Sequence, residues 1–106
     1  MSRYLWQVSF TPAGLKGVLE QGGSSRVAAT TEMVESLGGA LEACYFAFGE
    51  YDVYLIVDLP SHVDAAAISL AVNASGATVM RTVVLMAPAE IDAAVARGVA
   101  YRPPGA

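Results

Sequence analysis

Two apolar runs, residues 41–48 and 51–59, are separated only by Gly49-Glu50, and this arrangement constrains the fold more than any other part of the sequence. Apolar runs on either side of a two-residue loop are typical of a β-hairpin, and a glycine at the first loop position favours a type II′ turn. The turn sets the register, because strand pairing continues outward from it. It predicts that Phe48 pairs with Tyr51, Ala47 with Asp52, Phe46 with Val53, Tyr45 with Tyr54, and Cys44 with Leu55.

This register puts apolar side chains on both faces of the hairpin, since neighbouring residues of a strand point to opposite sides. We expect the more apolar face to lie beneath helices; it consists of Cys44, Phe46, Phe48, Tyr51, Val53, Leu55 and Val57. The other face consists of Ala43, Tyr45, Ala47, Asp52, Tyr54, Ile56 and Asp58. A sheet that is apolar on both faces needs both faces covered. We therefore expect a second copy of the chain to cover this second face.

The remaining segments alternate between strand and helix patterns. Residues 4–10 and 78–86 are rich in β-branched and aromatic residues and are predicted to be strands. Helices are predicted from Pro12 after a cap at Thr11 to Gly22-Gly23, from a cap at Ser24 or Ser25 to Gly38-Gly39, from a cap at Ser61 to about Asn73, and from Pro88 to Gly98.

The order is therefore βαββαβ with a terminal helix. With right-handed crossovers, it gives a ferredoxin-like α+β fold: an antiparallel sheet in the order 4-1-3-2, with both main helices on one face. The length of 106 residues predicts one domain, residues 1–100, with an extended tail over residues 101–106. Hydrophobic residues make up 55% of the chain and charged residues 15%, more apolar surface than so small a domain can bury. This excess predicts a homodimer or higher homo-oligomer, in the form of a dimeric α+β barrel.

Charge and cysteine content exclude several classes of protein. The six basic residues are scattered and the net charge is −4, which argues against a nucleic-acid partner. No apolar run is long enough to span a membrane, and the N-terminus does not read as a signal peptide, so we expect a soluble cytoplasmic protein. The only cysteine, Cys44, and the only histidine, His62, do not have the spacing of a metal site, and we expect no cofactor.

Asp52 and His62 are the candidates for acid–base chemistry. Asp52 shares its predicted face with Tyr45 and Tyr54, and a carboxylate beside two phenols suits proton abstraction and enolate stabilisation. The alternative is that Asp52 hydrogen-bonds backbone groups near the hairpin turn. His62 lies in the first turn of a predicted helix, where it either faces solvent or acts as a base. Arg81 is too far across the sheet to pair with Asp52 in one subunit, so such a pair would have to form across a dimer.

Two further groups of residues suit ligand binding. An apolar pocket between sheet and helices could be lined by Trp6, Phe10, Phe46, Phe48 and Met80 or Met86, although such residues more often form the core. The turn that contains Ser24, Ser25 and Arg26 offers hydroxyls, free N–H groups and a guanidinium to an anion. The alternative is an ordinary break between two helices.

The stretch from Ser36 to Asp52, SLGGALEACYFAFGEYD, with the apolar strand that follows to Pro60, resembles the GYD domain family. The family's Gly, Tyr, Asp motif corresponds to Gly49, Tyr51 and Asp52. Residues 4–14, 22–26, 71–76 and 101–104 are also similar. The resemblance implies a small bacterial protein with the fold of the dimeric α+β barrels, which include cofactor-free oxygenases, isomerases and binding proteins. Trp6 and Cys44 depart from the family's pattern, so a pocket lined by them would be peculiar to this chain.

Three functions are consistent with these observations. The first is a homo-oligomeric protein that binds a small apolar or aromatic molecule through Trp6, Tyr45, Tyr51, Tyr54 and Arg81. The second is a cofactor-free oxygenase, isomerase or cyclase with Asp52 or His62 as the general base. The third is a purely structural oligomer.

Overall fold

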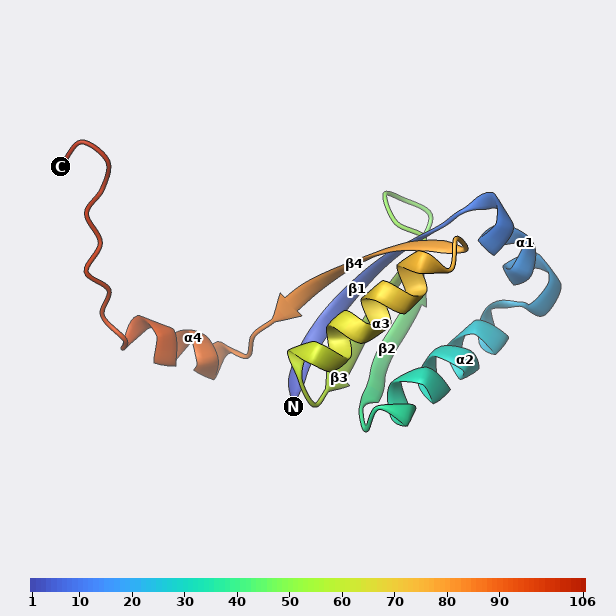
Figure 1. Cartoon of the computed structure of the whole chain (residues 1–106), viewed down its shortest axis with the longest axis horizontal. Helices are drawn as coiled ribbons and strands as arrows, with labels where there is room; N and C mark the ends of the chain where they lie inside the picture. Colours follow the sequence, from blue (N-terminus) through green and yellow to red (C-terminus); the bar gives the residue numbers. More distant parts are fainter.

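A computed structural model describes all 106 residues. The elements are β1 (Ser2–Phe10), α1 (Pro12–Gln21), α2 (Gly23–Ser36), β2 (Ala40–Phe46), β3 (Val53–Leu59), α3 (His62–Ala74), β4 (Thr78–Leu85) and α4 (Pro88–Val95). The four strands form one antiparallel sheet in the order β2-β3-β1-β4 (Figure 1). This is the predicted 4-1-3-2 order, and the ferredoxin-like α+β fold is confirmed.

The two central strands, β1 and β3, carry the core. Alternate residues of both strands are buried, because one face of the sheet packs against α2 and α3 while the other face is left open. The core residues from these strands are Tyr4, Trp6, Val8, Val53, Leu55, Val57 and Leu59. Val34 of α2 and Ile68 of α3 pack onto them. The alternation predicted for residues 53–57 is therefore confirmed.

The predicted hairpin register is right, but the predicted turn type is wrong. Phe46 lies opposite Val53, Tyr45 opposite Tyr54 and Cys44 opposite Leu55, as expected. Gly49 lacks the positive φ that a type II′ turn requires at this position. Regular strand ends at Phe46 and resumes only at Val53, so the connection is longer than two residues. The register is set by burial of alternate side chains rather than by the turn.

Because the connection is irregular, side-chain alternation does not extend through it. Phe48, predicted to lie beneath the helices, is fully exposed. Tyr51, predicted on the same face, instead turns to the open face of the sheet, where its hydroxyl meets Arg81. Both placements were wrong for the same reason: they continued a strand pattern past the end of the strand.

A β-bulge at Glu42 was also not predicted. Leu41 pairs with Val57 and Ala43 with Ile56, so Glu42 is the extra residue on β2. Strict alternation back from Cys44 would have turned Glu42 towards the helices and Leu41 away from them. The bulge reverses this: Leu41 packs against the core, and the Glu42 carboxylate pairs with Arg3 at 2.8 Å.

The helix caps agree with the sequence at two of three positions. The side chains of Thr11 and Ser61 accept hydrogen bonds from the backbone N–H groups of Gly14 and Asp64, as predicted. The predicted serine cap of α2 is wrong. That helix begins at Gly23 and is capped by Gly22 without a side-chain hydrogen bond, which places Ser24 and Ser25 inside its first turn.

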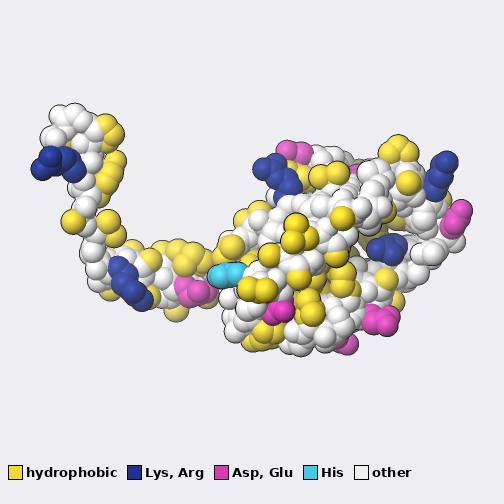
Figure 2. Space-filling view, in the orientation of Figure 1, with side chains coloured by type: hydrophobic (Ala, Val, Ile, Leu, Met, Phe, Trp, Pro, Cys, Tyr) yellow, Lys and Arg dark blue, Asp and Glu magenta, His cyan; other side chains and the backbone are white.

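The chain beyond β4 leaves the domain. Here α4 and residues 96–106 form an arm that extends away from the sheet (Figure 1). The radius of gyration is 17.0 Å, compared with about 13 Å for a compact chain of this length. Hydrophobic side chains are visible along the arm (Figure 2), and the large exposed ones include Ile91, Val95, Val99 and Tyr101.

Two glycines of α1 provide a matched test of how this helix docks. A Cβ at Gly14 would overlap the carbonyl oxygen of Ala77, whereas a Cβ at Gly17 would meet no atom within 4 Å. We expect Gly14→Ala to lower the free energy of unfolding by about 1–3 kcal/mol through overpacking. Gly17→Ala should raise it by about 0.5–1 kcal/mol through helix propensity. Urea denaturation measures both; equal effects would contradict the close approach of α1 to Ala77.

Candidate functional site

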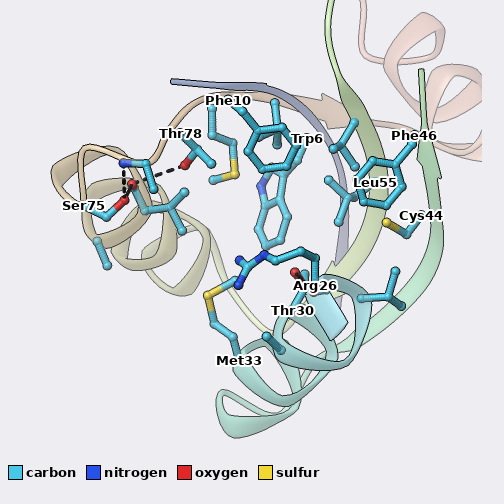
Figure 3. A pocket seen from close by; sticks show the side chains of 18 residues that line it. Trp6, Phe10, Arg26, Thr30, Met33, Cys44, Phe46, Leu55, Ser75 and Thr78 are labelled. Atoms are coloured by element: carbon cyan, nitrogen blue, oxygen red, sulfur yellow. Dashed lines mark hydrogen bonds between the residues drawn. The ribbon is translucent and has the colours of Figure 1, made fainter. Parts of the chain in front are cut away.

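A cavity of about 400 Å³ lies between the sheet and the two main helices (Figure 3). It is lined by 18 residues, 14 of them hydrophobic. The lining residues are Trp6, Val8, Phe10, Arg26, Val27, Ala29, Thr30, Met33, Cys44, Phe46, Val53, Leu55, Ala71, Val72, Ser75, Ala77, Thr78 and Met80. Every strand contributes, together with α2, α3 and the turn that leads into β4.

The cavity follows from the way the helices divide the sheet between them. The main contacts of α2 are with the edge strand β2, and those of α3 are with the opposite edge strand β4. The two helices therefore do not close over the central strands. Trp6 and Val8 of β1 and Leu55 of β3 form the floor of the gap, since these strands point their apolar residues towards it.

The polar side chains that line the cavity are one guanidinium and three hydroxyls. Thr30, Ser75 and Thr78 already donate their hydroxyl protons to backbone carbonyls of their neighbours. Two donors are left without a partner in the chain: the buried Nε1 of Trp6 and the guanidinium of Arg26. No aspartate, glutamate, lysine or histidine lines the cavity. Its interior is thus apolar, with a single positive charge contributed by α2.

Cys44 lines the cavity from β2 and is half-buried. Burial raises the pKa of its thiol, because the thiolate loses solvation there. Since the thiolate is the reactive form, this shift disfavours Cys44 as a nucleophile.

A second group of predicted site residues meets on the open face of the sheet. Arg81 Nη1 donates a hydrogen bond to the Tyr51 hydroxyl at 3.0 Å. The rings of Tyr51 and Tyr54 pack edge to face with centroids 5.9 Å apart, and Tyr45 lies opposite Tyr54. The structure thus places Arg81 on the open face. None of these four residues lines the cavity.

Asp52 has a structural partner. Its Oδ2 accepts a hydrogen bond from the backbone N–H of Phe10 at 2.8 Å, and its own N–H donates to the carbonyl of Val8 at 2.8 Å. The residue therefore joins the end of the hairpin to the end of β1, in agreement with the structural alternative. It neither pairs with Arg81 nor lines the cavity.

His62 is the first residue of α3, as predicted, and bonds a buried phenol. Its Nδ1 lies 2.5 Å from the hydroxyl of Tyr4, a residue that is 1% exposed. Both side chains border a shallow hollow beside α3, separate from the large cavity. No three histidine, cysteine or acidic side chains come close enough together to hold a metal ion.

The predicted cavity residues are a partial match. Trp6, Phe10, Phe46 and Met80 line it, whereas Phe48 and Met86 are exposed outside it. Of the predicted anion site, only Arg26 reaches the cavity; Ser24 and Ser25 face solvent. Four helix residues of the lining were not predicted: Val27, Thr30, Met33 and Val72. The helical spacing of 26, 27, 30 and 33 would have indicated the α2 face.

Comparison with known proteins gives one match. The family model of the GYD domain matches residues 4–95, which is most of the chain and includes α4. No curated protein and no solved structure matches the chain. No helix is long and apolar enough to cross a membrane.

The role of Asp52 is tested by removing its acceptor. We expect Asp52→Ala to lower the free energy of unfolding by about 1–2 kcal/mol, because the Phe10 N–H loses its side-chain acceptor. Asp52→Asn keeps one acceptor oxygen and should lose less. Asp92→Ala, on the exposed arm, is the control and should change stability little. Denaturant titration measures the free energy of unfolding of the three variants. An unchanged value for Asp52→Ala would mean that the hydrogen bond does not hold the hairpin to β1.

Proposed function

This chain belongs to the GYD domain family, and we propose that it is a small-molecule-binding domain that works as a homodimer. The observation that carries the binding proposal is the cavity of about 400 Å³ between sheet and helices. Ligand sites in proteins are typically apolar hollows of about 300–1,000 Å³ with a few polar groups, and this cavity has that size and lining.

The size of the cavity supports a role beyond packing. Protein cores are close-packed, and a void larger than a water molecule costs stability in proportion to its volume. A domain of 106 residues has little stability to spare. Trp6 and Cys44, which were expected from the sequence to line a pocket, both line the cavity.

The chemistry of the lining favours binding over catalysis. The two candidate bases, Asp52 and His62, both lie outside the cavity. Burial raises the pKa of the Cys44 thiol, and no acidic, lysine or histidine side chain lines the cavity to activate the hydroxyls of Thr30, Ser75 and Thr78. The oxygenase, isomerase or cyclase alternative therefore has no general base in this site. A purely structural oligomer would have no need of a cavity.

The open face of the sheet supports the homodimer. It carries Tyr45, Val79 and Val83, which are 73%, 58% and 40% exposed. Leu5 and Ile56 lie in the middle of the same face. Apolar side chains on a sheet face with no covering element are typical of a surface that another subunit buries. A second copy is the partner that fits, because the two-fold contact of equal faces is self-complementary.

The C-terminal arm also supports a homodimer. An isolated helix of eight residues is not stable in water and needs a surface to pack against. In α4, Ile91 and Val95 are 50% and 78% exposed, so their own domain does not provide that surface. A second copy would supply it, and the arm would then extend the dimer contact beyond the sheet.

Ligand binding is tested with decanol, a neutral apolar probe, and with the fluorescence of Trp6, the only tryptophan. We expect a saturable change in emission on titration. Thr30→Phe should abolish it by filling the cavity. Thr31→Phe is the matched control: both threonines are half-buried and donate to the carbonyl four residues earlier, but only Thr30 lines the cavity. No saturable change in the unaltered protein, or equal loss in both variants, would contradict the binding proposal.

Dimer formation is tested with two neighbouring valines of β4. Val83 lies on the open face opposite Leu5, whereas Val84 lies beside α3 on the other side of the sheet. Analytical ultracentrifugation of the unaltered chain should give a dimer. Val83→Lys should shift it to monomer, because a lysine cannot be buried there without a partner, and Val84→Lys should remain dimeric. A monomeric unaltered chain would overturn the proposal.

A further inference from the structure

The geometry points to an anionic ligand: a carboxylic acid with an apolar body, whose carboxylate binds Arg26 and whose body fills the cavity. This inference rests on the proposed binding function and adds the chemical class of the ligand.

Arg26 is the only charged residue among the 18 that line the cavity. It lies in the first turn of α2, and its side chain extends from that helix towards Trp6 (Figure 3). The guanidinium makes no ion pair within the chain; Arg3 and Glu42 form the one ion pair that the structure contains. A half-buried guanidinium with no anionic partner beside an apolar hollow is suited to a carboxylate, which it can bind through two parallel hydrogen bonds.

No side chain of the cavity lining balances the Arg26 charge, because neither aspartate nor glutamate lines the cavity. The other unpaired donor, the Nε1–H of Trp6, is buried and has no acceptor in the protein, but its atom has almost no surface open to a ligand. The Arg26 guanidinium is therefore the donor that binds the acceptor oxygens of a ligand. A cation would instead meet the Arg26 charge without a carboxylate to balance it.

The apolar part of the lining determines the rest of the ligand. Fourteen of the lining residues are hydrophobic, and Thr30, Ser75 and Thr78 already donate their hydroxyl protons to backbone carbonyls, so few polar groups are left for a ligand. A highly polar molecule such as a sugar or nucleotide would lose its hydration without replacement partners. An aliphatic chain or an aromatic ring makes no hydrogen bonds with water, so it loses none when it enters the cavity. One guanidinium in an otherwise apolar lining therefore favours an amphipathic acid with one charged end.

The test compares three probes that share one alkyl chain and differ only in the head group: decanoate, decanol and decylamine. Isothermal titration calorimetry at neutral pH should rank decanoate first, with an affinity about tenfold or more above that of decanol, and decylamine last. Arg26→Gln should reduce decanoate binding to the level of decanol and leave decanol unchanged. Arg97→Gln, which makes the same charge change on the exposed arm, should leave all three affinities unchanged.

The outcomes separate this inference from the function on which it rests. If none of the three probes binds the unaltered protein, the proposed function itself fails. If decanol and decanoate bind equally, the binding function stands and the acid preference is overturned. If Arg26→Gln weakens all three probes alike, Arg26 acts through packing and the preference is again overturned. Should Arg26→Gln fail to fold, Arg26→Lys keeps the charge and should retain the order of the three probes.

Discussion

The antiparallel pairing of β1 with β3 is the interaction on which the rest of the structure depends. These two strands lie at the centre of the sheet, and their alternate residues, from Tyr4 to Val8 and from Val53 to Leu59, form most of the core. Burial of one face locks the register, because a slip by one residue would expose every one of these side chains. Asp52 stabilises the same pairing at the C-terminal end of β1, where its side chain accepts a hydrogen bond from the backbone N–H of Phe10. The helices, the cavity and the open face are all positioned relative to this pair.

The cavity results from a mismatch between two helices and four strands. Each main helix packs towards one edge of the sheet, so neither covers the central pair completely. In a protein selected only for stability, larger side chains would fill such a gap. Here the gap is bordered by small residues such as Ala29, Ala71 and Ala77, and Arg26 is the one charged residue that lines it. The proposed binding site and its proposed preference for an amphipathic acid rest on these features.

Predictions from the sequence were right within regular strands, where alternation alone decides which face a side chain takes. They were wrong at the ends of strands and helices, where more than one local pattern applies. The pairs Phe46–Val53 and Tyr45–Tyr54 follow from alternation alone and are right. Alternation was also extended to Tyr51 and Phe48, where the strands have already ended, and there it was wrong. The bulge at Glu42 had a signal in the sequence: strict alternation would have pointed a carboxylate towards the helices and Leu41 away from them. Ser24 and Ser25 are good capping residues, but Gly22-Gly23 allowed α2 to begin earlier.

The sequence by itself determined the order of elements, the sheet topology and the buried face of β3, because these depend on periodicity, caps and turns within short segments. It also showed that the chain carries more apolar surface than it can bury. Only the tertiary structure decided that Arg26 reaches the cavity, that Arg81 meets Tyr51 on the open face, and that α4 leaves its own domain. Each of these depends on how far apart two packed elements lie, and that distance is set by the balance of many weak contacts between residues remote in the chain, which no local pattern records.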